Sequence, residues 1–411
     1  MKRTIRIASI AAAAMVAACF GAGPIPSAPT DATIVFAIAP SMTDNSNCTN
    51  YYIGDVALGS DAGYAVTVPY KPQSCMGGGS ISQGLPQPVF RFAKTGGTTM
   101  IGSAGPASNN SEPKIAATGS GAVWAYAITT PSNAIQIDPG PTVITFPQSS
   151  GPSFGAAALI QAADALYLAA APAQGQSTPN DPSYPCCGPT QNGGANPGSI
   201  QASPANAVHI APILACTATN RCLAVNTGSI YYFDQPTGST GLATSAVEET
   251  TKAGVTTKIG DIGMMSSINS PVGIAADDAT VVWATSVTYT NTGTPPAGCQ
   301  ITKRAAGGTP TVLLNTQHFS CIDVALDGGF AYFAIVSVVG SDSNNQTMRG
   351  DGVGRVDLAT GAVESLAPGI EGPMSGARRV YVDETDLYLV DPVVIAKVAK
   401  TALDGRNDFP P

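Results

Sequence analysis

A degenerate pattern recurs seven times along the 411-residue chain, and this repeat limits the fold more than any other feature of the sequence. Each copy starts with a short apolar strand, passes through a tight turn rich in Gly and Asp, and ends in a second strand centred on an aromatic residue. The first residues of the seven apolar strands are Val56, Ile115, Leu159, Leu223, Ile274, Val324 and Val380. Strand, tight turn and strand predict a β-hairpin in every copy.

Most copies continue with a third strand that carries Lys or Arg, a Gly-containing turn, and a fourth strand rich in Thr and Val. The segment from Ile301-Thr302-Lys303 to Gly307-Gly308-Thr309 is one example. The repeat aromatics recur about every 54 residues between Tyr64 and Tyr388, and we interpret them as packing between sheets. Four strands per copy predict an all-β fold, a single β-propeller of seven four-stranded blades over residues 31–405, with 406–411 as a tail. A pair of β-sandwiches is the alternative.

The segment Val282-Trp283-Ala284-Thr285 resembles the Tyr-Trp-Thr-Asp repeat. Over residues 31–400 the chain is similar to bacterial β-propellers of the YWTD and NHL repeat types. This resemblance implies an architecture and no particular activity. The last copy ends near Gly405 without a fourth strand, so we expect the apolar segment 32–38 to supply it and close the ring without an exposed edge.

The N-terminus has the pattern of an export signal. Lys2, Arg3 and Arg6 precede an apolar run of about a dozen residues, which is too short to span a bilayer. The run ends in Val16-Ala17-Ala18-Cys19, which resembles the lipobox of bacterial lipoproteins. The resemblance implies removal of residues 1–18, lipidation of Cys19 and a tether over residues 19–30. The protein would then be exported and anchored in the cell envelope, with the outer membrane favoured where one exists; ordinary secretion is the alternative.

Composition agrees with a turn-rich β protein, because only 11% of the residues are charged while Gly and Pro number 45 and 33. The net charge of −8 falls to −11 when the three basic residues of the signal are removed. The remaining Lys and Arg residues are not clustered, so we expect no nucleic-acid partner. Membrane association would depend on the Cys19 anchor.

Eight cysteines remain besides Cys19, and an even number in an exported chain predicts disulfides. They are Cys48, Cys75, Cys186, Cys187, Cys216, Cys222, Cys299 and Cys321. Proximity in the sequence favours the pairs Cys48–Cys75 and Cys299–Cys321. The other four cysteines are expected to pair with one another, and the sequence does not fix which pairs with which. Metal binding by those four is the alternative, but their spacing is not that of a zinc ribbon, and we expect neither a metal nor a cofactor.

Long connections are predicted on one face of the propeller, at residues 68–88, 171–199, 234–248, 288–298 and 337–352, whereas the hairpin turns on the other face are short. A ligand site, for a protein or carbohydrate partner, is expected on this disulfide-stapled face near the central channel. The alternative is that these loops have no role in binding. The candidate ligand-binding residues are Tyr70, Lys71, Tyr184, Tyr289, His318, Arg349, Asp351, Arg378 and Arg379.

No pattern of catalytic residues stands out. His209 and His318 are the two histidines, and nothing in the sequence places an acid or a nucleophile beside either. We interpret Arg349-Gly350-Asp351 as turn residues of a flexible loop rather than as an integrin-type motif. The sequence therefore favours a non-catalytic binding or scaffold module. The alternatives are an envelope propeller enzyme of lyase, hydrolase or quinoprotein type with its site at the channel mouth, and a purely structural envelope component.

Overall fold

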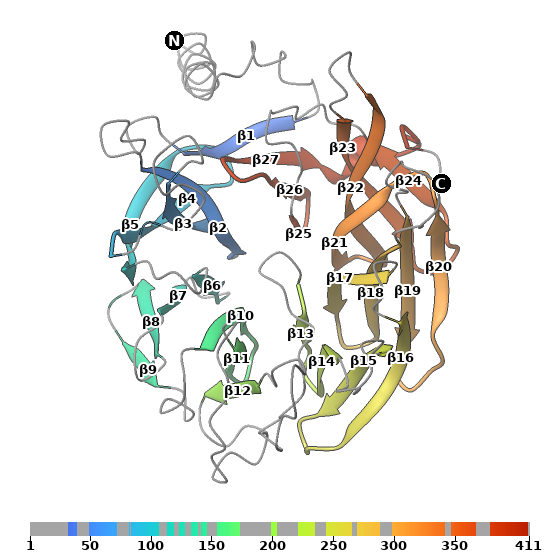
Figure 1. Cartoon of the computed structure of the whole chain (residues 1–411), viewed down its shortest axis with the longest axis horizontal. Helices are drawn as coiled ribbons and strands as arrows, with labels where there is room; N and C mark the ends of the chain where they lie inside the picture. Colours follow the sequence, from blue (N-terminus) through green and yellow to red (C-terminus); the bar gives the residue numbers. More distant parts are fainter. Residues whose placement is uncertain are drawn as a thin grey trace.

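The computed structural model describes the parts of the chain that form the predicted repeats. These are residues 32–38, 49–71, 82, 84–106, 113–118, 123–127, 133–138, 140, 142–145, 154–172, 199–203, 221–234, 244–264, 269–287, 298–341, 347–366 and 379–409. Their strands form seven separate antiparallel sheets, six of four strands and one of three. The sheets stand around a common centre like the blades of a propeller (Figure 1). The predicted all-β propeller is confirmed.

We number the blades along the chain and name their strands from the centre outwards. Blade 1 contains β2 (Asn50–Leu58), β3 (Ala62–Tyr70), β4 (Pro86–Ala93) and β5 (Thr98–Pro106). Blade 2 contains β6 (Lys114–Ala117), β7 (Val123–Ala127), β8 (Asn133–Asp138) and β9 (Val143–Thr145). Blade 3 contains β10 (Phe154–Gln161), β11 (Leu166–Pro172) and β12 (Ser199–Ser203). Blade 4 contains β13 (Leu223–Val225), β14 (Ser229–Asp234), β15 (Thr244–Thr251) and β16 (Thr256–Met264).

The last three blades complete the ring. Blade 5 contains β17 (Asn269–Ala276), β18 (Thr280–Val287), β19 (Cys299–Ala305) and β20 (Thr311–Thr316). Blade 6 contains β21 (Ser320–Asp327), β22 (Phe330–Ser341), β23 (Thr347–Asp357) and β24 (Val363–Leu366). Blade 7 contains β25 (Arg379–Val382), β26 (Asp386–Val390), β27 (Val394–Ala399) and, outermost, the N-terminal strand β1 (Ala32–Ala37). β1 pairs antiparallel with β27, so the first strand completes the last blade.

The hydrophobic core lies between the blades, and the repeat aromatics belong to it. Tyr64, Tyr167, Tyr232, Trp283, Tyr332 and Tyr388 are all at most 3% exposed, as expected for residues that fill the space between sheets. Glycines make room for large rings at several places. A Cβ on Gly260, for example, would lie 2.7 Å from the ring of Trp283 on the neighbouring blade.

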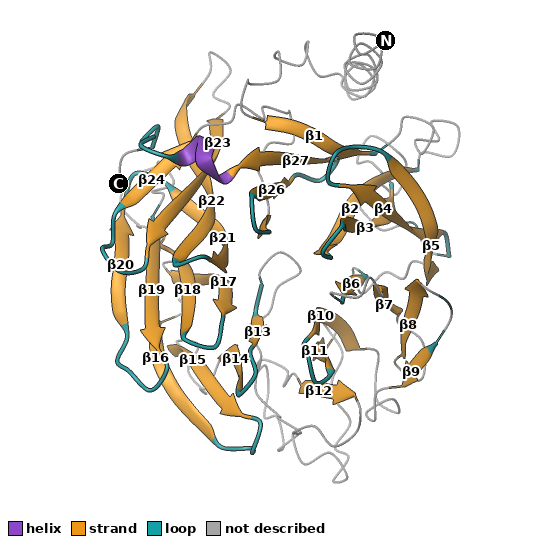
Figure 2. Cartoon of the chain, turned by 180° about the vertical axis from the view of Figure 1, so that it is seen from behind, coloured by secondary structure: helices purple, strands orange, loops and turns teal. Residues whose placement is uncertain are grey.

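The two faces of the ring differ in their connections. The first-to-second and third-to-fourth strand turns lie on one face, which we call the turn face. The second-to-third strand connections and the blade-to-blade links lie on the other, the link face. Figure 2 shows the ring from behind, with the helical turn η2 (Lys400–Leu403) after β27.

Ion pairs join neighbouring blades on the turn face. An aspartate in the first turn of one blade pairs with a lysine of the next blade: Asp164 with Lys252, Asp327 with Lys400, and Asp383 with Lys94. The last of these joins blade 7 to blade 1 across the closure of the ring. Burial opposes the ionisation of Asp383, but Lys94 and two backbone N–H groups outweigh it and lower the pKa of this carboxyl to about 2.

Some connections on the link face are shorter than the sequence suggested. β22 and β23 extend as a hairpin in which Val338 pairs with Arg349 and Val336 with Asp351, so most of the loop predicted at residues 337–352 is strand. The β-branched residues that continue past Ile335 explain the extension, because they favour a pleated conformation. Blade 7 has a short connection, in which Asp391 N–H donates to the Val394 carbonyl at 2.9 Å.

The C-terminal residues pack on blade 6. Ser365 of β24 forms a parallel bridge with Asn407, and its hydroxyl accepts the Phe409 N–H at 2.8 Å. The Phe409 ring lies against Gly352, where a Cβ would be 2.3 Å from it. The tail therefore covers an outer edge that would otherwise offer unpaired backbone groups.

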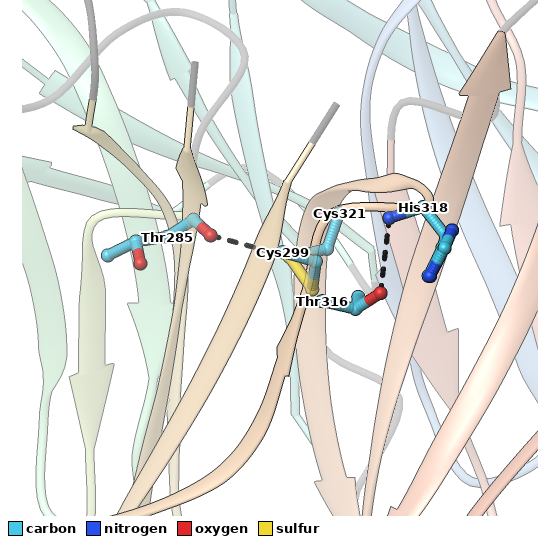
Figure 3. The surroundings of a disulfide bond; sticks show 5 residues. All are labelled: Thr285, Cys299, Thr316, His318 and Cys321. Carbon is cyan, nitrogen blue, oxygen red and sulfur yellow. Dashed lines mark hydrogen bonds between the residues drawn. A yellow bond between two sulfur atoms is a disulfide. The ribbon is translucent and has the colours of Figure 1, made fainter. Parts of the chain in front are cut away.

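The disulfide between Cys299 and Cys321 joins β19 of blade 5 to β21 of blade 6, near the carbonyl group of Thr285 (Figure 3). This pair confirms one of the two predicted pairings. Cys222 is also disulfide-bonded. The cysteines Cys48, Cys75, Cys186, Cys187 and Cys216 lie outside the described residues. Among the described residues, none belongs to a helix with the length and hydropathy needed to span a bilayer.

Candidate functional site

Charged residues recur at one position of the repeat, directly before the apolar run that begins each copy. Asp55, Lys114, Asp323 and Arg379 hold this position in blades 1, 2, 6 and 7. The other three blades have the small residues Ala158, Cys222 and Gly273 there. The innermost strands start on the link face and surround the centre of the ring (Figure 1). The ring therefore brings these side chains together around its centre.

Asp55 joins the first, second and last blades. Its side chain is 8% exposed and pairs with the guanidinium of Arg379 on β25. The Tyr381 hydroxyl donates to the same carboxylate at 3.3 Å, and the Ile115 N–H of β6 donates to its other oxygen at 3.0 Å. Burial of Arg379 would lower the pKa of its guanidinium, but the Asp55 charge outweighs burial and raises it.

Asp323 is fully buried between blades 5, 6 and 7. One carboxylate oxygen accepts the Val380 N–H at 3.1 Å and lies 3.1 Å from the guanidinium of Arg221. The other oxygen has no hydrogen-bond partner among the described residues and lies against Gly273. A Cβ on Gly273 would be 2.8 Å from this oxygen. Burial raises the pKa of Asp323, and the nearby charge of Arg221 opposes that rise.

Arg221 crosses the centre of the ring from blade 4. Its guanidinium donates to the Val324 carbonyl of blade 6 at 3.1 Å and to the Val380 carbonyl of blade 7 at 2.9 Å. The guanidinium also lies over the Tyr381 ring, 4.8 Å from its centroid. Its own carbonyl accepts the Ile274 N–H of blade 5 at 2.9 Å. One residue thus contacts three blades besides its own.

We call Asp55, Arg221, Asp323, Arg379 and Tyr381 the axial cluster. The cluster satisfies backbone groups that the innermost strands leave free, because such a strand has a neighbour on one side only. Carboxylates accept from N–H groups and guanidinium groups donate to carbonyls. The side chain of Arg221 remains 22% exposed, and Tyr381 is partly buried. Among the described residues, no group of three or more His, Cys, Asp or Glu side chains could hold a metal ion.

The structure places one predicted candidate in the axial cluster, Arg379. Tyr70 ends β3 and contacts Tyr52 edge to face, with ring centroids 5.6 Å apart, and Lys71 follows it on the link face. The backbone N–H of His318 donates to the Thr316 hydroxyl at 3.1 Å, and its imidazole points away from the disulfide (Figure 3). Arg349 and Asp351 lie within β23 and not in a flexible loop, which corrects that interpretation. Tyr184, Tyr289, Arg378 and His209 lie outside the described residues.

Sequence reasoning missed Asp55, Arg221, Asp323 and Tyr381. Asp55 and Asp323 stand directly before Val56 and Val324, so a charge at the same repeat position was visible in the sequence. Tyr381 occupies a repeat position that holds Ala in most of the other copies. Arg221 is one residue earlier than this pattern, and its contacts with blades 6 and 7 depend on closure of the ring.

Comparison with known proteins gives no family. No family model matches the chain, and no curated protein matches it. Among solved structures, YCF48 bound to a D1 peptide is 9% identical over 90% of this chain and 100% of that chain, with a TM-score of 0.44. The acylaminoacyl peptidase of Pyrococcus horikoshii is 12% identical over 86% of this chain and 53% of that chain, with a TM-score of 0.47.

The extracellular domains of Drosophila semaphorin 1b are 8% identical over 90% of this chain and 88% of that chain, with a TM-score of 0.41. At such identities and TM-scores, these likenesses say nothing about what the chain binds. The class of the protein follows from its own sheet order, which is that of a β-propeller closed by its N-terminal strand.

Proposed function

We propose that this chain is a lipid-anchored β-propeller of the bacterial cell envelope that binds a protein or carbohydrate partner without catalysis. The signal segment and the lipobox ending at Cys19 support export and anchoring. The axial cluster supports binding, and it is the observation on which the proposal rests. It gathers two acids, two guanidinium groups and a phenol from blades 1, 4, 6 and 7 around the centre of the ring.

The chemistry of the cluster suits recognition. Its acids pair with guanidinium groups and backbone N–H groups, and no pair of a nucleophile and an activating base lies within it. Arg221 keeps an exposed fraction of 22% while its guanidinium lies over the Tyr381 ring, and Arg and Tyr side chains are enriched where proteins bind their partners. Tyr70 and Lys71 add similar groups on the link face of blade 1.

The binding proposal is tested with the purified mature chain and a panel of envelope oligosaccharides and short peptides, by thermal unfolding. A true ligand raises the melting temperature of the wild type. Tyr381→Phe should reduce that rise, whereas Arg91→Gln, which removes an exposed ion pair with Asp61 on the turn face, should preserve it. Loss of the rise in Arg91→Gln alone, or chemical conversion of a panel compound, would overturn the proposal.

The anchoring proposal is tested on cells. Wild type should sediment with membranes, and Cys19→Ala should be released from them. Protease digestion on intact and lysed cells then tells the cell surface from an interior leaflet. Membrane retention of Cys19→Ala would contradict lipid anchoring.

A further inference from the structure

The point at which the chain enters the ring carries an inference about orientation. β1 is antiparallel to β27, with Ala32 opposite Val398 and Ala37 opposite Val394. Val398 lies towards the end of β27, next to Lys400, whose N–H donates to the carbonyl of Thr385 in the first turn of blade 7. Ala32 therefore lies at the turn face, and β1 runs from there to the link face.

The chain between Cys19 and this point is short. Twelve residues, 20–31, separate the lipobox cysteine from Ala32. Fully extended they would reach about 40 Å. A random-coil chain of twelve residues has an end-to-end distance of about 19 Å.

The height of the ring decides which face such a tether can bring to a membrane. β2 has nine residues, and a strand of that length spans about 30 Å. With the turn face down, the tether bridges only the gap to the membrane. With the link face down, it would have to cover the height of the ring beside blade 7, about three quarters of its full extension. Such stretching carries a cost in conformational entropy.

The turn face also suits the neighbourhood of a lipid surface. The acids Asp164, Asp327 and Asp383 on this face each pair with a lysine of the next blade, so their charges are compensated. The turns between them are short, and no long loop of the described residues stands in the way.

We propose that the lipid anchor holds the propeller with its turn face towards the membrane and its link face, with the axial cluster, pointing away from it. This inference rests on the proposed lipid anchor at Cys19. The partner of the axial cluster is then reached from the aqueous side, and the lipids of the anchoring leaflet are excluded as its ligand.

The test uses the lipidated full-length mature chain in phosphatidylcholine vesicles that carry a nitroxide on a fraction of their headgroups. A fluorescent amino acid is placed at Thr95 or at Leu85, both exposed. These positions follow and precede β4, so they sit on the turn face and the link face of one blade, about 26 Å apart. The fluorophore at Thr95 should be quenched about twofold more than the one at Leu85.

The outcomes separate the two proposals. If the protein floats with the vesicles and Cys19→Ala does not, the anchor is supported, and equal or reversed quenching then overturns the orientation alone. If Cys19→Ala also floats, or the wild type does not, the lipid anchor fails and the orientation fails with it. A variant with twelve added Gly and Ser residues after Pro29 should float normally and lose most of the difference in quenching, because the tether no longer restricts the face.

Discussion

Arg379 of the last blade pairs with Asp55 of the first, although 324 residues separate them in the sequence. The same carboxylate accepts the Ile115 N–H of the second blade. A buried ion pair thus lies across the junction where the two ends of the chain meet. Removing one partner of such a pair leaves a buried charge uncompensated.

We expect Arg379→Met to lower the free energy of unfolding by about 3–5 kcal/mol. The double variant Arg379→Met with Asp55→Asn should lose much less than the sum of the single losses, because no unpaired charge remains and the amide oxygen still accepts the Ile115 N–H. Urea denaturation of the four proteins measures the coupling. Additive losses would show that the pair does not stabilise the closure.

Gly273 makes room for Asp323. Gly273→Ala places a methyl group 2.8 Å from the carboxylate and 2.7 Å from the Val324 nitrogen, so we expect a loss of about 1–3 kcal/mol in stability. Gly228→Ala is the matched control, because the only atom within 4 Å of its Cβ is an amide oxygen of Asn226 at 4.0 Å. Thermal unfolding compares the two, and equal effects would contradict the packing described for Asp323.

The ion pair of Asp383 and Lys94 predicts the acid limit of stability. The pKa of Asp383 is lowered from 3.8 to about 2 in the folded chain, so the unfolded chain binds more protons between these values. The stabilisation is complete above pH 4 and is lost as the pH falls towards 2. Asp383→Asn should reduce the loss of unfolding free energy as the pH falls from 4 to 2. Asp61→Asn, at an exposed pair, should leave this pH dependence unchanged. If the stability of Asp383→Asn falls as steeply with pH as that of the wild type, other groups are responsible for acid unfolding.

The disulfide of Cys299 and Cys321 closes a loop with a sequence separation of 22. Replacing both cysteines by alanine should cost about 3 kcal/mol, since the bond restricts the unfolded chain. Chemical denaturation with and without reductant measures the loss. Reductant should destabilise the wild type more than the double variant. If it destabilises the double variant more, another disulfide is responsible for the loss of stability.

The architecture could be predicted from the sequence because its signals are local. Turn residues such as Asp277-Asp278 and Gly328-Gly329 fix the hairpins, and the apolar strand at 32–38 was available to complete the last blade. Strand ends were less predictable. Val336 and Val338 continue the pleat of β22 beyond the expected loop, and nothing local marks where pairing stops.

The axial cluster was largely beyond sequence reasoning for a physical reason. Its contacts join residues on different blades, and they exist only when the ring has closed. Arg379 was among the candidates because the topology placed it on the face of the long connections, near the central channel. The partners Arg221 and Asp323, 102 positions apart, meet across blade 5, and no local pattern encodes that distance.

The pairing of β1 with β27 determines when the ring can close as the chain is synthesised and folds. The strand that leaves the ribosome early has its partner near the C-terminus, at Val394–Ala399. The ring therefore cannot be sealed until nearly the whole polypeptide has been delivered. Contacts between such distant segments form slowly. For the exported chain that we propose, this delay would keep the ring open until the C-terminal strand has also crossed the membrane.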